Sequence, residues 1–110
     1  MIIDFEKTEK KVVENFKGGN GKLIMRAADD GKVKIMRNIL TPGSSIGMHT
    51  HEGNCEVMYI IKGEITFVCD GKEETARAGE VHYCPCGHTH CAENRTAEDA
   101  EFFAIVPEMK

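Results

Sequence analysis

Two histidines and a glutamate lie close together in the segment "HTHEGNCE", at positions 49, 51 and 56. Imidazole nitrogens and carboxylate oxygens both bind divalent transition metals. Alternate residues of a strand share a face, with Cα atoms roughly 6.6 to 6.8 Å apart, so the rings of His49 and His51 could reach one ion. On an antiparallel neighbour, the carboxylate of Glu56 could return to the same point. One hypothesis is therefore that the segment supplies three ligands of a metal site; the alternative, which the histidine pair alone would favour, is imidazoles on an exposed sheet face that bind no metal.

The elements that must position these ligands are predicted to be strands. From Lys22 onward, short runs rich in Ile, Val, Met, Phe and Thr alternate with turn residues, which is typical of an all-β domain. Asp70-Gly71 indicates a hairpin, because glycine accepts the positive φ of a tight turn. About nine short strands are expected, at residues 22–28, 32–40, 46–51, 56–62, 64–69, 72–77, 81–84, 88–93 and 100–106.

An open sheet of so many strands would leave edges unpaired, so we expect closure into a barrel or a two-sheet jelly roll, and we assign the fold class as a jelly-roll β-barrel. Residues 22–110 form this predicted barrel domain, and residues 1–21 form an N-terminal segment before it. Within that segment, "TEKKVVENF" at 8–16 could be an edge strand or a short helix, and "GGNG" at 18–21 is a connection. The length of 110 residues leaves room for one domain.

Composition and charge exclude several classes of partner. The formal net charge is −4 and basic residues are interspersed with acidic ones, so nucleic acid is not an expected partner. No apolar run approaches the roughly 20 residues of a membrane helix. The start, "MIIDFEKTEKK", lacks the pattern of a secretion signal, so a cytoplasmic protein is expected. The five cysteines are then expected to be reduced thiols.

The spacing around the histidine pair resembles the first sequence motif of the cupin superfamily. That motif has a glycine, five residues, His-x-His, three or four residues, a glutamate, six residues and a glycine. In this chain it reads Gly43, "SSIGM", His49, Thr50, His51, "EGNC", Glu56, "VMYIIK", Gly63. The second cupin motif is matched by Gly79, "EVHYC", Pro85, Cys86, Gly87, "HT", His90, "CAE", Asn94. Two complete motifs in order are much more specific than one.

The resemblance implies a fourth ligand, His90, from a distant strand. It implies that one divalent metal (Fe, Mn, Ni, Co or Zn) lies inside the barrel, held by His49, His51, Glu56 and His90. Small cupins are often dimers, and Tyr59 and Ile61 would lie on the face of their strand opposite Glu56, so a homodimer is expected. Met58 and Ile60 share the parity of Glu56 and are predicted to line the cavity.

A rival hypothesis places zinc on the run "CPCGHTHC", with Cys84, Cys86, Cys91 and His88 as candidate ligands. The run lacks a second Cys-x-x-Cys pair, which argues against it. Small apolar side chains in a packed barrel are the alternative for the cysteines at 55, 69, 84 and 91. The roles of Cys55 and Cys86 stay open. His82 and His88 are expected on the surface or in the pocket lining, and His88 shares the parity of His90.

Four protein ligands would leave two positions open on an octahedral ion, for a substrate, water or dioxygen. The first functional hypothesis is an enzyme of oxygenase, decarboxylase or isomerase type that acts on a small organic molecule. Sugar phosphates are not favoured as substrates, because no phosphate loop is recognisable. His88 and Tyr83 are the candidate acids or bases. The second hypothesis is a non-catalytic module that binds a metal or a small ligand. The third is that the motif residues only form turns and the pocket is empty.

Overall fold

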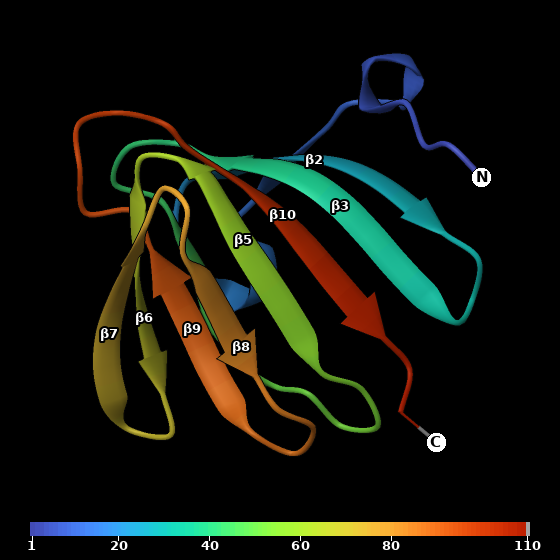
Figure 1. Ribbon diagram of the computed structural model, residues 1–110. Helices are drawn as coiled ribbons and strands as arrows, with labels where there is room; N and C mark the ends of the chain where they lie inside the picture. The colour runs from blue at the N-terminus through green and yellow to red at the C-terminus, as the bar shows by residue number, and fades with distance from the viewer. Residues whose placement is uncertain (110) are drawn as a thin grey trace.

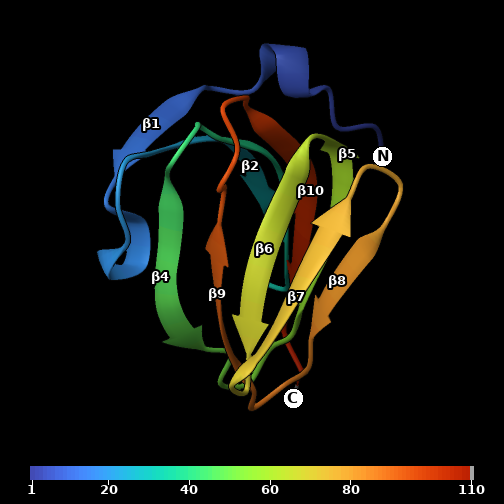
Figure 2. The ribbon, with the colours of Figure 1, turned by 90° about the vertical axis from the view of Figure 1, so that its left-hand side faces the viewer.

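The computed structural model describes residues 1–109 as two antiparallel sheets that face each other (Figure 1). The six-stranded sheet has the order β1 (Lys11–Glu14), β2 (Lys22–Asp29), β3 (Val33–Leu40), β10 (Ala100–Pro107), β5 (Glu56–Lys62) and β8 (Val81–Cys84). The four-stranded sheet has the order β4 (Ser45–Thr50), β9 (Thr89–Glu93), β6 (Glu64–Cys69) and β7 (Lys72–Arg77). In Figure 2 the four-stranded sheet lies toward the reader, with β2 and β10 behind it.

The predicted all-β jelly-roll fold is confirmed, and all nine predicted strands are present within one or two residues of their expected ends. The structure adds a tenth strand, β1, which pairs with β2 at the edge of the six-stranded sheet. Of the two alternatives for residues 8–16, the structure has the edge strand. The strands form two hydrogen-bonded sheets and not one closed ring, so the core is enclosed by packing between the sheets.

Alternation of apolar and polar residues explains which face of each strand is buried. In β5, Met58 and Ile60 are buried while Tyr59 between them is exposed. The inner faces of both sheets bury the core in this way. Its largest fully buried apolar side chains are those of Leu23, Leu40, Met58, Ile60, Ile65, Phe67 and Phe102.

A close backbone contact fixes the segment before β2 against β4. The 3-10 helix η2 (Phe16–Gly18) has Lys17 in the left-handed region, at φ 56°. A Cβ atom added at Gly47 would lie 2.0 Å from the carbonyl oxygen of Lys17, and one at Gly19 would lie 2.2 Å from that of Ser45. Only glycine allows this approach. The contact positions Phe16 and Lys17 over the space between the sheets.

Helical structure in residues 1–109 consists of two single turns, η1 (Phe5–Lys7) and η2. Neither is long or apolar enough to cross a membrane, and no other helix is described for this part of the chain. The turn at Asn94, the last residue of the second motif, is tied to two neighbouring segments. Its buried amide nitrogen donates to the carbonyl oxygens of Leu40, at 2.8 Å, and Glu98, at 2.7 Å.

Candidate metal centre

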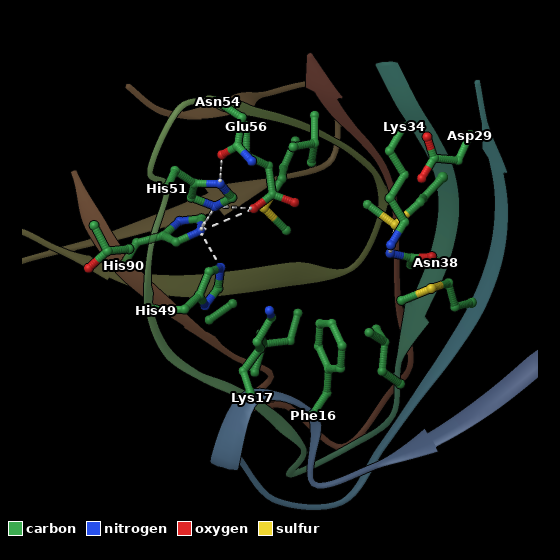
Figure 3. Close-up of a pocket in the computed structure, with 18 of the residues that line it drawn as sticks. Phe16, Lys17, Asp29, Lys34, Asn38, His49, His51, Asn54, Glu56 and His90 are labelled. Carbon is green, nitrogen blue, oxygen red and sulfur yellow. Dashed lines mark hydrogen bonds and ion pairs between the residues drawn. The ribbon is translucent and has the colours of Figure 1, made fainter. Parts of the chain in front are cut away.

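Four side chains from three segments of the chain converge between the two sheets (Figure 3). His49 lies near the end of β4, directly opposite His90 of β9 in the antiparallel register. His51 follows β4, and Glu56 is the first residue of β5 in the facing sheet. One potential ligand atom from each of these residues lies within 4.8 Å of all the others. The fold therefore brings together the four residues named from the sequence.

The distances between these atoms match those expected around one ion. His51 Nε2 lies 3.0 Å from His90 Nε2 and 3.1 Å from Glu56 Oε1. His90 Nε2 lies 3.1 Å from His49 Nε2. Two ligand atoms that are each about 2.1 Å from a metal and at right angles around it would lie about 3.0 Å apart. The residues therefore fit a small divalent cation.

The other nitrogen of each ring determines where its proton lies. His49 Nδ1 is 2.7 Å from the carbonyl oxygen of Gly47, and His51 Nδ1 is 2.7 Å from the amide oxygen of Asn54. Because both oxygens only accept hydrogen bonds, each Nδ1 must carry the hydrogen. In the neutral form of each ring, the Nε2 atom then presents a lone pair to the centre of the site. This is the protonation state in which histidine binds a metal.

His90 is oriented in the same way by a second histidine that lies behind it. His90 Nδ1 lies 3.0 Å from His82 Nε2, and His82 Nδ1 lies 3.0 Å from a carboxylate oxygen of Glu74. The carboxylate accepts from His82 Nδ1, so His82 Nε2 is the acceptor for the Nδ1–H of His90. The ring of His82 also stacks on Phe67, with centroids 3.7 Å apart and an interplanar angle of 8°.

The expectation of a surface or pocket-lining position for His82 is wrong, because the residue is 2% exposed and lies behind the ligands. Alternation within β8 could have indicated this. His82 shares a face with Cys84, and the antiparallel register places them opposite Met58 and Glu56. All of these side chains point into the core.

Burial and hydrogen bonding shift the pKa of Glu56 in opposite directions, and they also shift the pKa values of the histidines beside it. Burial alone would raise the pKa of Glu56, but in the metal-free chain the hydrogen bonds that protonated His51 and His90 rings donate to it outweigh burial and lower the pKa to about 2. The hydrogen bond to Glu56 raises the pKa of His51. Burial lowers the pKa of His49. An ionised carboxylate and a neutral His49 are both the forms that bind metal.

A cavity of about 320 Å³ lies beside the four residues. Met58 lines it as predicted, whereas Ile60 is fully buried and is not part of its wall. Lys17 of η2 lies near His49 at one side, and Lys34 and Asn38 of β3 lie at the opposite side (Figure 3). These three residues were not identified from the sequence. Their inward direction depends on the pairing of strands, and no short motif marks it.

The structure does not support the rival zinc site on the cysteine-rich run. Within residues 1–109, the group formed by the three histidines and Glu56 is the one cluster with metal-site proximity. Cys84 is fully buried, and burial raises the pKa of its thiol to about 12. Cys86 is exposed. Cys55 is buried as expected, whereas Cys69 and Cys91 are only half-buried.

His88 and Tyr83, the candidate acids or bases, lie away from the cavity. His88 is partly exposed and forms an ion pair and hydrogen bond with Asp70 on the surface. Tyr83 is 52% exposed on the outer face of β8. Shared parity with His90 therefore did not bring His88 into the site, because it lies in the loop before β9 begins at Thr89.

The fold and the site together define a β-sandwich with an interior cluster of three histidines and one glutamate. The family model described as "Cupin domain" matches residues 36–106. The chain belongs to this cupin family, which confirms the resemblance seen in the two motifs. The chain is also 33% identical over 112 residues to a Thermotoga maritima protein named "Oxalate-binding protein". That match covers 96% of this chain and 93% of the relative.

Solved structures agree with this assignment. The crystal structure of a predicted oxalate decarboxylase from Thermotoga maritima has a TM-score of 0.92 and 32% sequence identity, over 99% of this chain and 100% of that chain. A sugar phosphate isomerase of the cupin superfamily from Silicibacter pomeroyi has a TM-score of 0.79 and 18% identity, over 99% of this chain and 76% of that one. The second likeness concerns the fold alone.

Proposed function

We propose that this chain binds one divalent transition metal through His49, His51, Glu56 and His90 and uses it to capture a small carboxylate such as oxalate. The convergence of unprotonated Nε2 atoms on an ionised carboxylate carries the proposal. Lone pairs and a negative charge that are brought together in a buried place are stabilised by a cation, and one metal ion can contact all four atoms, whereas one proton bridges only two of them. The ligand types suit Fe, Mn, Ni, Co or Zn.

The bound metal would act as a Lewis acid with coordination positions open to ligand oxygens. The chain itself would supply orientation and positive charge. Lys17 lines the cavity near His49, and its ammonium group would offset the charge of a carboxylate placed there. The names given to the Thermotoga maritima matches, which refer to oxalate binding and to oxalate decarboxylation, point to the same class of ligand.

Capture of the ligand is favoured over turnover. Proton transfer to or from a substrate would need an acid or base within hydrogen-bond reach of it. Neither His88 nor Tyr83 faces the cavity, so neither can fill this role, and the lysines Lys17 and Lys34 in its wall are assigned here to binding an anion. A decarboxylase, oxygenase or isomerase is therefore the second candidate, and it is distinguished from a binding module by the fate of the ligand.

Calorimetric titration with oxalate tests this proposal. The protein loaded with Mn²⁺ should bind oxalate, and the same protein stripped with a chelator should lose that binding. Unchanged oxalate should be recovered after prolonged incubation with the loaded protein. Equal affinity before and after stripping would contradict the metal-dependent site, and release of carbon dioxide would replace the binding module with an enzyme.

We also propose that the chain forms a homodimer through the outer face of the six-stranded sheet. Four large apolar side chains are exposed there on neighbouring strands: Tyr59, Val81, Tyr83 and Ile105. Tyr59 and Val81 are direct cross-strand partners. A continuous apolar surface of this kind is typical of an interface between subunits. A two-fold axis through it would bury the same side chains on both copies.

A further inference from the structure

The cavity is larger than oxalate requires. Its volume of about 320 Å³ falls within the range of small-molecule sites, about 300 to 1,000 Å³. Oxalate has only six non-hydrogen atoms, and the four candidate ligands occupy one end of the space (Figure 3). The opposite end is walled by Lys34 and Asn38 of β3. The features of that end therefore bear on what the rest of the ligand is.

Sheet register sets the separation between the two ends. Met58 of β5, Ala104 of β10 and Met36 of β3 lie in one row across the sheet. β5 and β3 are both antiparallel to β10, so Glu56 lies level with Lys34. Two strand spacings place their backbones about 10 Å apart. A ligand bound near Glu56 would need to extend beyond the size of oxalate to reach the opposite wall.

Asn38 places an unpartnered amide in this wall. The residue is 2% exposed and lines the cavity, yet its Oδ1 atom has no hydrogen-bond partner. The one hydrogen-bond acceptor described for its Nδ2 atom is the thioether sulfur of Met36, at 3.8 Å. Buried amides in folded proteins are nearly always hydrogen-bonded, and an amide both donates and accepts. Asn38 is thus equipped to bind a hydroxyl, carbonyl or carboxyl group that enters the cavity.

Lys34 adds positive charge at the same end. It lies four residues before Asn38 on the inward-facing side of β3 and lines the cavity. Asp29 is its cross-strand partner in β2, but no ion pair within 4.0 Å joins Lys34 to a carboxylate in residues 1–109. The carboxylates of Asp29 and Glu108 also line the cavity, but the Lys34 ammonium is engaged by neither in a direct ion pair and can contact an anionic group of the ligand. An ammonium beside an amide is a donor set suited to a carboxylate.

We propose that Lys34 and Asn38 form a second subsite, so that the ligand is an acid longer than oxalate with oxygen groups at both ends. One end would bind at the metal centre and the other at Lys34 and Asn38, across the apolar side chains of Met36, Met58 and Phe102. This inference rests on the proposed function, because it assigns the orientation of a ligand held at the metal. It predicts a preference for diacids in the size class of 2-oxoglutarate.

The test compares oxalate with 2-oxoglutarate as probes, by calorimetry on the Mn²⁺-loaded full chain. Lys34→Met keeps the length of the side chain and removes its charge, and Asn38→Ala removes the amide. Each variant should weaken 2-oxoglutarate binding at least tenfold and change oxalate binding less than twofold. Lys72→Met, on the exposed strand β7, is the matched control and should change neither affinity.

The outcomes separate the subsite from the proposed function. Binding of oxalate but not 2-oxoglutarate by the wild-type chain, or equal losses for both probes in Lys34→Met, would overturn the subsite and leave the metal centre intact. Binding of neither probe by the loaded wild-type chain would overturn both. Metal content and thermal unfolding of each variant establish that it is folded, and Lys34→Met carries the test if Asn38→Ala does not fold.

Discussion

His82 Nε2 lies 3.0 Å from His90 Nδ1, so a buried histidine outside the ligand set fixes the direction in which His90 presents its other nitrogen. His82 is itself fixed by Glu74 and by stacking on Phe67. The geometry of the candidate metal centre thus depends on residues that do not belong to it. Partners of this kind commonly change metal affinity by 10- to 100-fold.

Replacement of His82 should therefore weaken metal binding without removing a ligand. His82→Phe keeps a ring that can stack on Phe67 and removes the acceptor for His90. We expect the metal affinity to fall by about 10- to 100-fold in a chelator competition assay. Glu74→Gln is the comparison, and it should have a smaller effect because the Glu74 side chain is 61% exposed. An unchanged affinity in His82→Phe would show that His90 is oriented without this hydrogen bond.

A methyl group at position 47 should separate η2 from β4. The added Cβ atom would meet the carbonyl oxygen of Lys17 at 2.0 Å, which requires the backbone to move. Gly47→Ala is expected to destabilise the fold by about 1 to 3 kcal/mol and to weaken oxalate binding, since Lys17 would shift. Chemical denaturation and titration measure the two effects. Met48→Ala changes a neighbouring exposed residue and should have little effect on stability or on oxalate binding. Equal effects of the two variants would refute the role of the contact between Gly47 and Lys17.

The ionised state of Glu56 should make the metal-free protein sensitive to acid. Its pKa is about 2 in the folded chain and 4.5 for the unperturbed group, so the unfolded state binds more protons between these values. The stabilisation is complete above about pH 4.5 and is lost as the pH falls towards 2. We expect the free energy of unfolding of the wild-type chain to fall more steeply over this range than that of Glu56→Gln. Parallel pH profiles of the two chains, measured by denaturation, would argue against a depressed pKa.

The proposed dimer predicts a variant that is monomeric and folded. Tyr59→Lys places a charge in the centre of the apolar surface on β5, at a side chain that is 43% exposed in the single chain. Sedimentation should show a dimer for the wild-type chain and a monomer for the variant, with similar unfolding temperatures at low concentration. A wild-type chain that sediments as a monomer at high concentration would contradict this interface.

Alternation and turn residues were sufficient to predict nine strands because each sheet has one buried and one exposed face. The spacing of His49, His51 and Glu56 indicated a shared site, and the second motif added His90. Two facing sheets were one of the two predicted forms of closure, but the order of strands within each sheet was not predicted, because sequence pattern does not report which strand edges hydrogen-bond. A related reason explains why the sequence did not indicate that three further residues lie at the site or its cavity: His82, Lys34 and Asn38. Their positions relative to the site follow from cross-strand register, which joins residues far apart in the chain.

The most direct test of the central claim is the metal content of the purified chain, measured by elemental analysis after expression without added metal. We predict about one divalent transition metal per wild-type chain and none in the double variant His49→Ala/His90→Ala. His88→Ala, which removes a surface histidine outside the site, should keep the wild-type content. Full metal content in a folded double variant would contradict the account.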